Sequence, residues 1–226
     1  LQLVFLLAFQ LLFFLFALTI FSGFNPFAAI LVSGILGALI SLPVAFLIFR
    51  LRGAYFAIGT WVVAEIFRLS FAQIQSLGGG SGSSLPVGIV KSIASSKAMR
   101  ESLTYWMILG LTVFILLSVY LILRSRRGIA LIAIRDNELA SQSLGINILR
   151  SKLFVYVVTA GLTTILGGLI FLQKLRISPD AAFNVNDWTA FVIFIVVIGG
   201  IGTIEGPIIG VLVFFILRET LADLGS

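Results

Sequence analysis

The chain has 226 residues, of which 60% are hydrophobic and only 11% are charged, and its formal net charge is +6. Soluble domains usually carry about a quarter charged residues, so this composition excludes a water-soluble globular domain. The absence of Cys and His excludes disulfides, thiol nucleophiles, imidazole-dependent triads and Cys/His metal sites. Because the cations lie between long apolar runs, we attribute them to membrane orientation and not to nucleic-acid binding. The composition predicts a polytopic membrane protein with no catalytic or metal site.

Apolar runs long enough to cross a bilayer, which takes about 20 residues, follow one another along the chain. They are 1–22, 27–49, 53–75, 103–123 and 153–173. A last apolar region, 188–217, is interrupted by glycines and a proline, and we expect two shorter helices joined by a bend. The predicted fold is therefore all-α, with about seven hydrophobic helical segments in one transmembrane domain over 1–226. Leu1 already lies inside an apolar run, so we expect the chain to be part of a longer polypeptide.

The loops predict the orientation. Residues 124–152 form the most basic stretch, and basic loops stay in the cytoplasm. Counting spans backward places Arg50 and Arg52 on the same side and the polar segment 76–102 outside. Within 76–102, the Gly/Ser run 78–84 lacks the Gly-Lys-Ser/Thr ending of a phosphate loop and has no preceding strand. We expect a flexible external loop and no nucleotide-hydrolysing site.

Small residues recur at helical spacing in three regions, with three members in each. They are Ser33, Gly37 and Ser41; Ala160, Thr164 and Gly168; and Gly202, Gly206 and Gly210. Close backbone approach at small residues is the usual way in which membrane helices pack. Each set is expected to lie on one helix face and to mark a packing surface.

Glu65 and Arg68 lie inside the third span, where an ionised side chain costs at least about 2.5 kcal/mol. Two interpretations stay open. In one, Glu65 and Arg68 neutralise each other, or Arg68 extends to the interface. In the other, Glu65 lines a polar cavity for a substrate or a proton. Tyr55, Thr60 and Trp61 belong to the same span and are candidates for that cavity.

The break in the last apolar region has two interpretations. Discontinuous helices at membrane depth occur where backbone lines a cavity, so this segment is a candidate hinge. Its residues are Gly199, Gly200, Gly202, Gly206 and Pro207. The alternative is a tight helical hairpin at the membrane surface, with Glu205 at the water.

The basic stretch contains a segment, 128–151, that mixes apolar and charged residues. It predicts two short helices, with Asp136 or Asn137 capping the second and Gly145 ending it. Half-apolar helices outside the membrane favour docking into a partner protein. A membrane-surface amphipathic loop is the alternative.

The residues from Arg135 to Asn147, R-D-N-E-L-A-S-Q-S-L-G-I-N, resemble the cytoplasmic coupling loop of ABC-importer permeases. The similarity is closest to the high-affinity branched-chain amino-acid permeases, and to the second of the two that such systems pair. Further stretches agree with that family in the same order: L-R-G-A-Y-F-A-I from Leu51, A-E-I-x-R from Ala64, I-S-P-D from Ile177, and V-I-G-G-I-G from Val197 with Gly206-Pro207.

The resemblance implies a transport subunit of the bacterial inner membrane, working with two ABC ATPases, a second related permease and an external substrate-binding protein. ATP and Mg would be bound by the ATPases, with no cofactor in this chain. Glu138 and Gly145 become the natural docking contacts, within a set that comprises Arg135, Asp136, Asn137, Glu138, Ala140, Gly145 and Asn147. The competing class is a secondary carrier or channel with Glu65 as its coupling site. A purely structural subunit would explain the spans but not the docking loop.

Overall fold

The computed structural model describes residues 25–51, 53–75, 79–93, 96–182, 186–203 and 205–224. The predicted span at 1–22 lies outside these residues. The described residues fall into two compact units, one that ends at Ala182 and one that starts at Asn186. The expectation of one domain over the whole chain stays a prediction.

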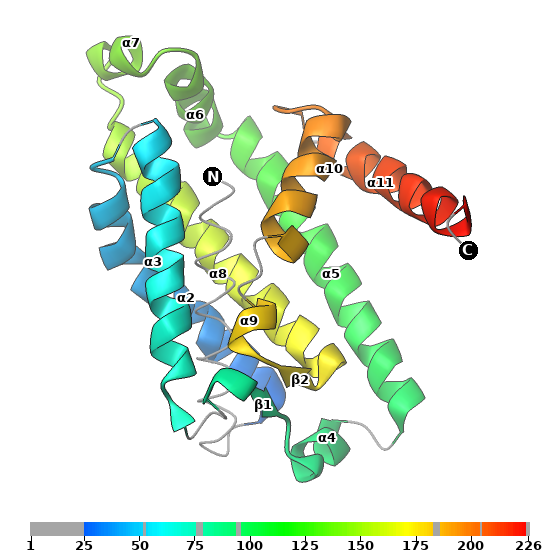
Figure 1. The fold of residues 1–226 in the computed structure, drawn as a ribbon. Helices are drawn as coiled ribbons and strands as arrows, with labels where there is room; N and C mark the ends of the chain where they lie inside the picture. The colour runs from blue at the N-terminus through cyan, green and yellow to red at the C-terminus, as the bar shows by residue number, and fades with distance from the viewer. Residues whose placement is uncertain are drawn as a thin grey trace. The chain divides into compact units, whose positions relative to one another are not determined.

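Four long helices form the first unit (Figure 1): α2 (Pro26–Ile48), α3 (Ala54–Ala72), α5 (Lys97–Arg124) and α8 (Ile148–Lys174). All four are long and apolar enough to cross a membrane, which confirms the spans predicted at 27–49, 53–75, 103–123 and 153–173. Helix α5 begins earlier than its apolar run because Ser96 caps it. The Ser96 hydroxyl accepts a hydrogen bond from the Met99 N–H at 3.2 Å.

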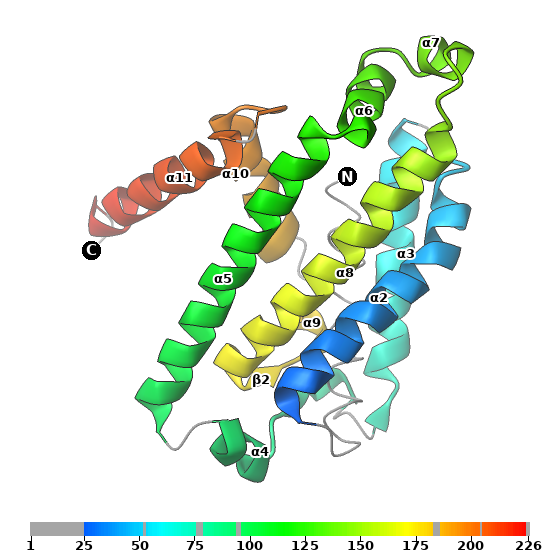
Figure 2. The ribbon, with the colours of Figure 1, turned by 180° about the vertical axis from the view of Figure 1, so that it is seen from behind.

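Helices α2 and α8 lie side by side in both views (Figures 1 and 2) and approach closely through small residues. A side chain at Gly37 would collide with Thr164, and one at Gly34 would come within 2.6 Å of Ile165. The predicted small-residue sets of α2 and α8 are buried throughout: Ser33, Gly37, Ser41, Ala160, Thr164 and Gly168. These two packing predictions are confirmed.

Apolar clusters hold α3 against this pair at both ends. One cluster joins the end of α2 to the starts of α3 and α8, and its buried members are Val44, Ala45, Ile48, Ala64 and Tyr156. The other lies at the opposite end and contains Ala29, Ile30, Phe71, Leu85, Ile93, Leu169, Phe171, Leu172 and Ala182. The second cluster takes residues from the 76–102 segment as well as from the spans.

That segment contains regular structure, so the expected flexible loop is corrected. It comprises the 3-10 turn η2 (Gly79–Ser81), strand β1 (Ser83–Ser84) and helix α4 (Val87–Ile93). Strand β1 pairs antiparallel with β2 (Arg176–Ile177), with Ser83 opposite Ile177. The Gly/Ser composition conceals this order because the apolar residues that fix it, Leu85 and Ile93, become buried only against distant helices. Helix α9 (Pro179–Ala182) follows β2.

The second unit is a pair of helices after a π-helical turn, η3 (Asn186–Ala190). Helix α10 (Phe191–Gly199) and helix α11 (Glu205–Leu224) are joined by a short bend, as predicted for 188–217. Their backbones touch: a side chain at Gly206 would collide with the Gly200 carbonyl, and one at Gly210 with that of Ile195. Gly202 does not share this helix face, contrary to expectation, because it lies in the bend with φ of 97°.

Candidate functional site

Two short helices follow α5 and stand apart from the spans (Figures 1 and 2): α6 (Arg126–Asp136) and α7 (Glu138–Ser143). Asn137 separates them, and its side-chain oxygen accepts a hydrogen bond from the Ala140 N–H at 3.0 Å. The predicted pair of short helices is confirmed, with Asn137 and not Asp136 as the cap of the second.

Helix α7 ends in a Schellman motif centred on Gly145. The Ile146 N–H donates to the Ser141 carbonyl at 3.1 Å, and the Gly145 N–H donates to that of Gln142 at 3.0 Å. Gly145 has φ of +81°, in the left-handed region that a residue without Cβ enters at little cost. This geometry confirms that Gly145 ends the helix, and it fixes the direction in which the chain turns back to α8.

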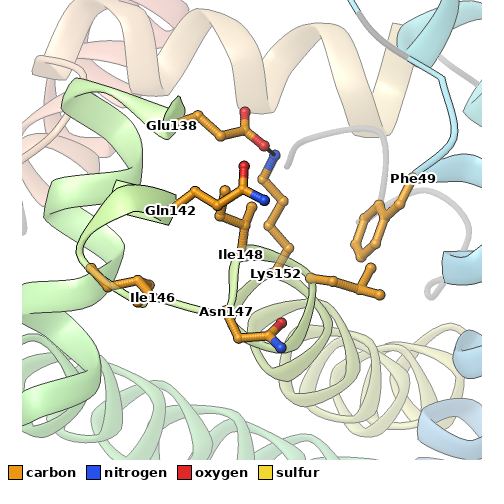
Figure 3. Close-up of a pocket in the computed structure, with 9 residues that line it drawn as sticks. Phe49, Glu138, Gln142, Ile146, Asn147, Ile148 and Lys152 are labelled. Atoms are coloured by element: carbon orange, nitrogen blue, oxygen red, sulfur yellow. Dashed lines mark hydrogen bonds and ion pairs between the residues drawn. The ribbon is translucent and has the colours of Figure 1, made fainter. Parts of the chain in front are cut away.

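A side-chain ion pair ties α7 to the first turn of α8 (Figure 3). Lys152 Nζ donates to Glu138 Oε1 at 2.7 Å. The Asn147 side chain caps α8 by accepting from the Arg150 N–H at 2.9 Å. A cleft of about 480 Å³ opens beside this ion pair. Its lining residues are Phe49, Glu138, Gln142, Gly145, Ile146, Asn147, Ile148, Leu149 and Lys152.

Two leucines at α7 are exposed to water. Leu139, in the helix, is 77% exposed, and Leu144, its C-cap residue, is 79% exposed. All seven candidate docking residues are exposed as well: Arg135, Asp136, Asn137, Glu138, Ala140, Gly145 and Asn147. Ser141, between them, is buried and donates to the Asn137 carbonyl at 2.8 Å. The arrangement is a short, capped helix with two uncovered leucines, Leu139 and Leu144, among exposed polar residues.

Glu65 and Arg68 of helix α3 form a three-residue network with Asp180 of α9. Arg68 donates from Nη2 to Glu65 Oε1 at 2.5 Å and from Nη1 to Asp180 Oδ1 at 2.6 Å. The pairing of Glu65 with Arg68 was one of the two interpretations predicted from sequence. The contact of Arg68 with Asp180, which lies in α9, was not predicted from the sequence. The two stretches that supply these residues, 64–68 and 177–180, do appear among the segments that carry the family resemblance, and this could have suggested their contact.

One of the other residues considered for a cavity around Glu65, Thr60, faces away from it. Thr60 is fully buried, and its hydroxyl donates to the Ala57 carbonyl at 2.8 Å within α3. Tyr55 and Trp61 are exposed. Trp61 and Glu65 are four residues apart and therefore share a helix face, whereas Thr60 faces the core.

The Gly/Pro segment forms a tight turn between α10 and α11. Gly200 and Gly202 both have positive φ, and the Gly206 N–H donates to Thr203 Oγ1 at 3.0 Å. Pro207 lies in the first turn of α11, where its missing N–H costs nothing. Glu205 is exposed. These are the features of a helical hairpin, and the hinge role of Gly199, Gly200, Gly202, Gly206 and Pro207 stays a prediction.

Four helices that could span a membrane, together with the exposed α6–α7 pair, define a mainly helical, polytopic membrane protein. Across the part of the chain that the structure describes, no group of three or more acidic residues is placed to hold a metal ion.

The chain belongs to the family described as branched-chain amino acid transport system / permease component, whose model matches residues 3–226. It is thus a multi-pass membrane protein of that permease family. No solved structure matches it.

Three relatives carry related descriptions. The high-affinity branched-chain amino acid transport system permease protein LivM of Escherichia coli (strain K12) is 27% identical over 223 residues, 89% of this chain and 52% of the relative. Its counterpart in Salmonella typhimurium (strain LT2) is 29% identical over 215 residues, 85% and 49% of the two chains. A probable LivM of Methanocaldococcus jannaschii is 26% identical over 188 residues, 83% and 52%. The chain spans about half the length of these relatives.

Proposed function

We propose that this chain is a permease subunit of an ATP-driven importer that moves branched-chain or related amino acids across the bacterial inner membrane by alternating access. Two ABC ATPases, a second related permease and an external binding protein complete the importer, and the ATPases bind ATP and Mg. The family match and the descriptions of the relatives support the substrate class. The chain itself performs no chemistry.

The observation that carries this proposal is the exposure of two leucines, Leu139 and Leu144, on the capped helix α7 and its C-cap. Leu139 and Leu144 point into water in the isolated chain, and a partner that covers them removes apolar surface from solvent at about 25 cal/mol per Å². The surrounding polar residues, Arg135 to Asn147, form the polar rim that accompanies such an apolar centre. We assign this surface to the ATPase subunit.

Movement of the ATPase would reach the spans through α8. The Glu138–Lys152 ion pair holds α7 against the start of α8, whose N-terminus is capped by Asn147. Helix α8 packs on α2 through the contact of Gly37 with Thr164. Because interfaces with this little free space move as units, a push on α7 shifts α8 and α2 together.

We place the substrate pathway on the exposed face of α3, with Tyr55, Trp61 and Glu65 as candidate lining residues. Thr60 contributes only by packing, since it is buried. The alternative of a secondary carrier needs Glu65 to take up and release a proton. Arg68 and Asp180 form a network with that carboxylate, which favours a structural ion pair over a proton-coupling site.

The test uses the full-length chain assembled with its partners in liposomes. Gly145→Pro and Glu138→Arg alter the docking surface, and Lys97→Gln, an exposed change at the other end of α5, is the matched control. We expect the two docking variants to lose uptake while ATP hydrolysis continues, and the control to transport normally. Full ATP-stimulated uptake in both docking variants would contradict the proposed mechanism.

A further inference from the structure

Two arginines of the basic stretch line a small cleft between α6 and α8. The cleft has a volume of about 200 Å³. Its lining residues are Arg127, Leu131, Arg150, Ser151 and Phe154. Arg127 comes from the first turn of α6 and Arg150 from the first turn of α8. Both arginines are exposed, so a ligand can reach them from outside the chain. The larger cleft beside α7 shares no lining residue with this one.

The two arginines have no carboxylate partner in the part of the chain that the structure describes. Every ion pair between described residues involves another cation. The hydroxyl of Ser151, the remaining polar side chain of the cleft, donates to the Asn147 carbonyl at 3.0 Å. The guanidinium groups of Arg127 and Arg150 are therefore the donors that this cleft offers to a ligand, and both are positively charged.

Phe154 positions one of these charges at the cleft. The Cζ atom of Arg127 lies 4.3 Å from the centre of the Phe154 ring, a distance typical of a cation–π contact. Such a contact places the guanidinium but supplies no oxygen that could accept its hydrogen bonds. Neither Arg127 nor Arg150 donates a side-chain hydrogen bond to a described residue. The cleft thus holds two cations beside each other without an acceptor, which favours an anionic ligand.

The cleft lies where the spans meet the basic stretch. The apolar run of α8 starts at residue 153, so Phe154 belongs to the span and Arg150 precedes it. From Arg150 to Phe154 the helix rises about 6 Å. Helix α5 reaches the same boundary just before α6 begins, where Arg124 lies over the Tyr120 ring at 4.6 Å, and tyrosine is enriched at membrane interfaces. The cleft is therefore at the depth of lipid headgroups, whereas the surface that we assign to the ATPase belongs to α7.

We propose that Arg127 and Arg150 bind the phosphate of an anionic phospholipid headgroup, in the cytoplasmic leaflet for the orientation that the basic loops predict. Guanidinium groups form paired, charge-assisted hydrogen bonds with phosphate oxygens, and anionic lipids give the cytoplasmic leaflet its negative surface potential. The volume of about 200 Å³ is below the range of about 300–1,000 Å³ usual for whole small molecules, which suits a headgroup and not a nucleotide.

A lipid bound in this way joins the first turns of two helices that are distant in sequence. Helix α6 leads into α7, and α8 continues into the membrane (Figures 1 and 2). The bound phosphate then fixes the base of the α6–α7 pair at the bilayer surface. This inference goes beyond the proposed function, because neither the transported substrate nor the contact with the ATPase enters it.

The test is native mass spectrometry of the full-length chain, assembled with its partners in detergent, with added lipids. Phosphatidylglycerol is compared with a diacylglycerol of the same acyl chains, which lacks the phosphate, and we expect much stronger retention of phosphatidylglycerol. Arg127→Gln and Arg150→Gln should each lower that retention about tenfold, the effect of losing one charge-assisted hydrogen bond. The matched control is Arg126→Gln, which removes an exposed charge from the same turn of α6 but does not alter the cleft, and it should change retention little.

Four results would overturn the proposal. Equal retention of phosphatidylglycerol and diacylglycerol by the unaltered protein would show that the phosphate is not recognised, even if the variants do not fold. An equal loss of retention in Arg126→Gln and Arg127→Gln would show general attraction to the basic stretch. Release of the ATPase from Arg127→Gln and Arg150→Gln, with retention of phosphatidylglycerol unchanged, would assign the cleft to acidic residues of that partner. Displacement of phosphatidylglycerol by millimolar inorganic phosphate would show a site for a free anion.

Discussion

Arg68 Nη1 donates a hydrogen bond to Asp180 Oδ1 at 2.6 Å, across 112 positions of the chain. The contact fastens α3 to the short helix α9 that follows α8 and β2. Because Arg68 also forms an ion pair with Glu65, one cation pairs with two carboxylates. The network therefore links the third span to the far end of α8, opposite the end at which α7 is attached.

Charge removal within this network should show non-additive effects on stability. Arg68→Gln leaves Glu65 without its cation in a spanning helix, where a lone charge costs at least about 2.5 kcal/mol. The Glu65→Gln/Arg68→Gln double variant leaves no such charge. We therefore expect the double variant to be more stable than Arg68→Gln alone, as measured by the thermal unfolding midpoint in detergent. A double variant less stable than the single one would contradict this account.

Asp180→Asn should have a smaller effect on stability than Arg68→Gln. Asp180 is 73% exposed, and exposed ion pairs contribute about 0–1 kcal/mol.

Glu65→Gln should distinguish the importer from the carrier. An ATP-driven permease in which Glu65 is a structural partner of Arg68 should retain uptake in this variant, with some loss of stability. A proton-coupled carrier should lose uptake. Transport is measured in liposomes with ATP present and with the proton gradient collapsed. Complete loss of ATP-driven uptake in a variant that folds normally would return Glu65 to the centre of the mechanism.

The elements that sequence predicted well are those determined by local composition. Spans of about 20 apolar residues, a cap at Asp136 or Asn137 and the turn at Gly145 each depend on residues close in the chain. The Asp180 contact and the burial of Leu85 depend on residues from distant segments, so no local pattern revealed them. Gly202 was misplaced for a related reason. Its spacing from Gly206 fits a helix, but Gly202 lies in the bend between α10 and α11, whereas Gly206 lies in α11.

Gly145 should tolerate asparagine better than alanine. At φ of +81° a side chain strains the backbone by about 1–2 kcal/mol, and asparagine enters this region more readily than other residues. We expect Gly145→Ala to weaken the coupling of ATP hydrolysis to uptake and Gly145→Asn to preserve most of it. The ratio of transported substrate to hydrolysed ATP is the measurement. Equal ratios for the two variants would show that the backbone turn does not matter for coupling.

The ion pair between Glu138 and Lys152 can be separated from a direct role of Glu138 by exchanging the two charges. If the pair acts by holding α7 on α8, Glu138→Lys and Lys152→Glu should each impair coupled uptake, and the two together should restore it. If Glu138 instead contacts the ATPase directly, the exchanged pair should remain impaired. Rescue is judged from uptake at saturating ATP, with expression of each variant in the membrane as the control.

The close contact between α2 and α8 can be tested with two glycines of spanning helices, Gly37 and Gly110, that differ in their surroundings. A side chain at Gly37 would collide with Thr164, whereas nothing lies within 4 Å of one added at Gly110 in α5. Gly37→Leu should therefore force the helices apart and lower the thermal unfolding midpoint, since overpacking costs about 1–3 kcal/mol. Gly110→Leu should leave the midpoint unchanged or raise it, because leucine favours helix over glycine. If both variants unfold at the same temperature, the close approach of α2 and α8 is not what stabilises this unit, and α7 would have no rigid pair of spans to move.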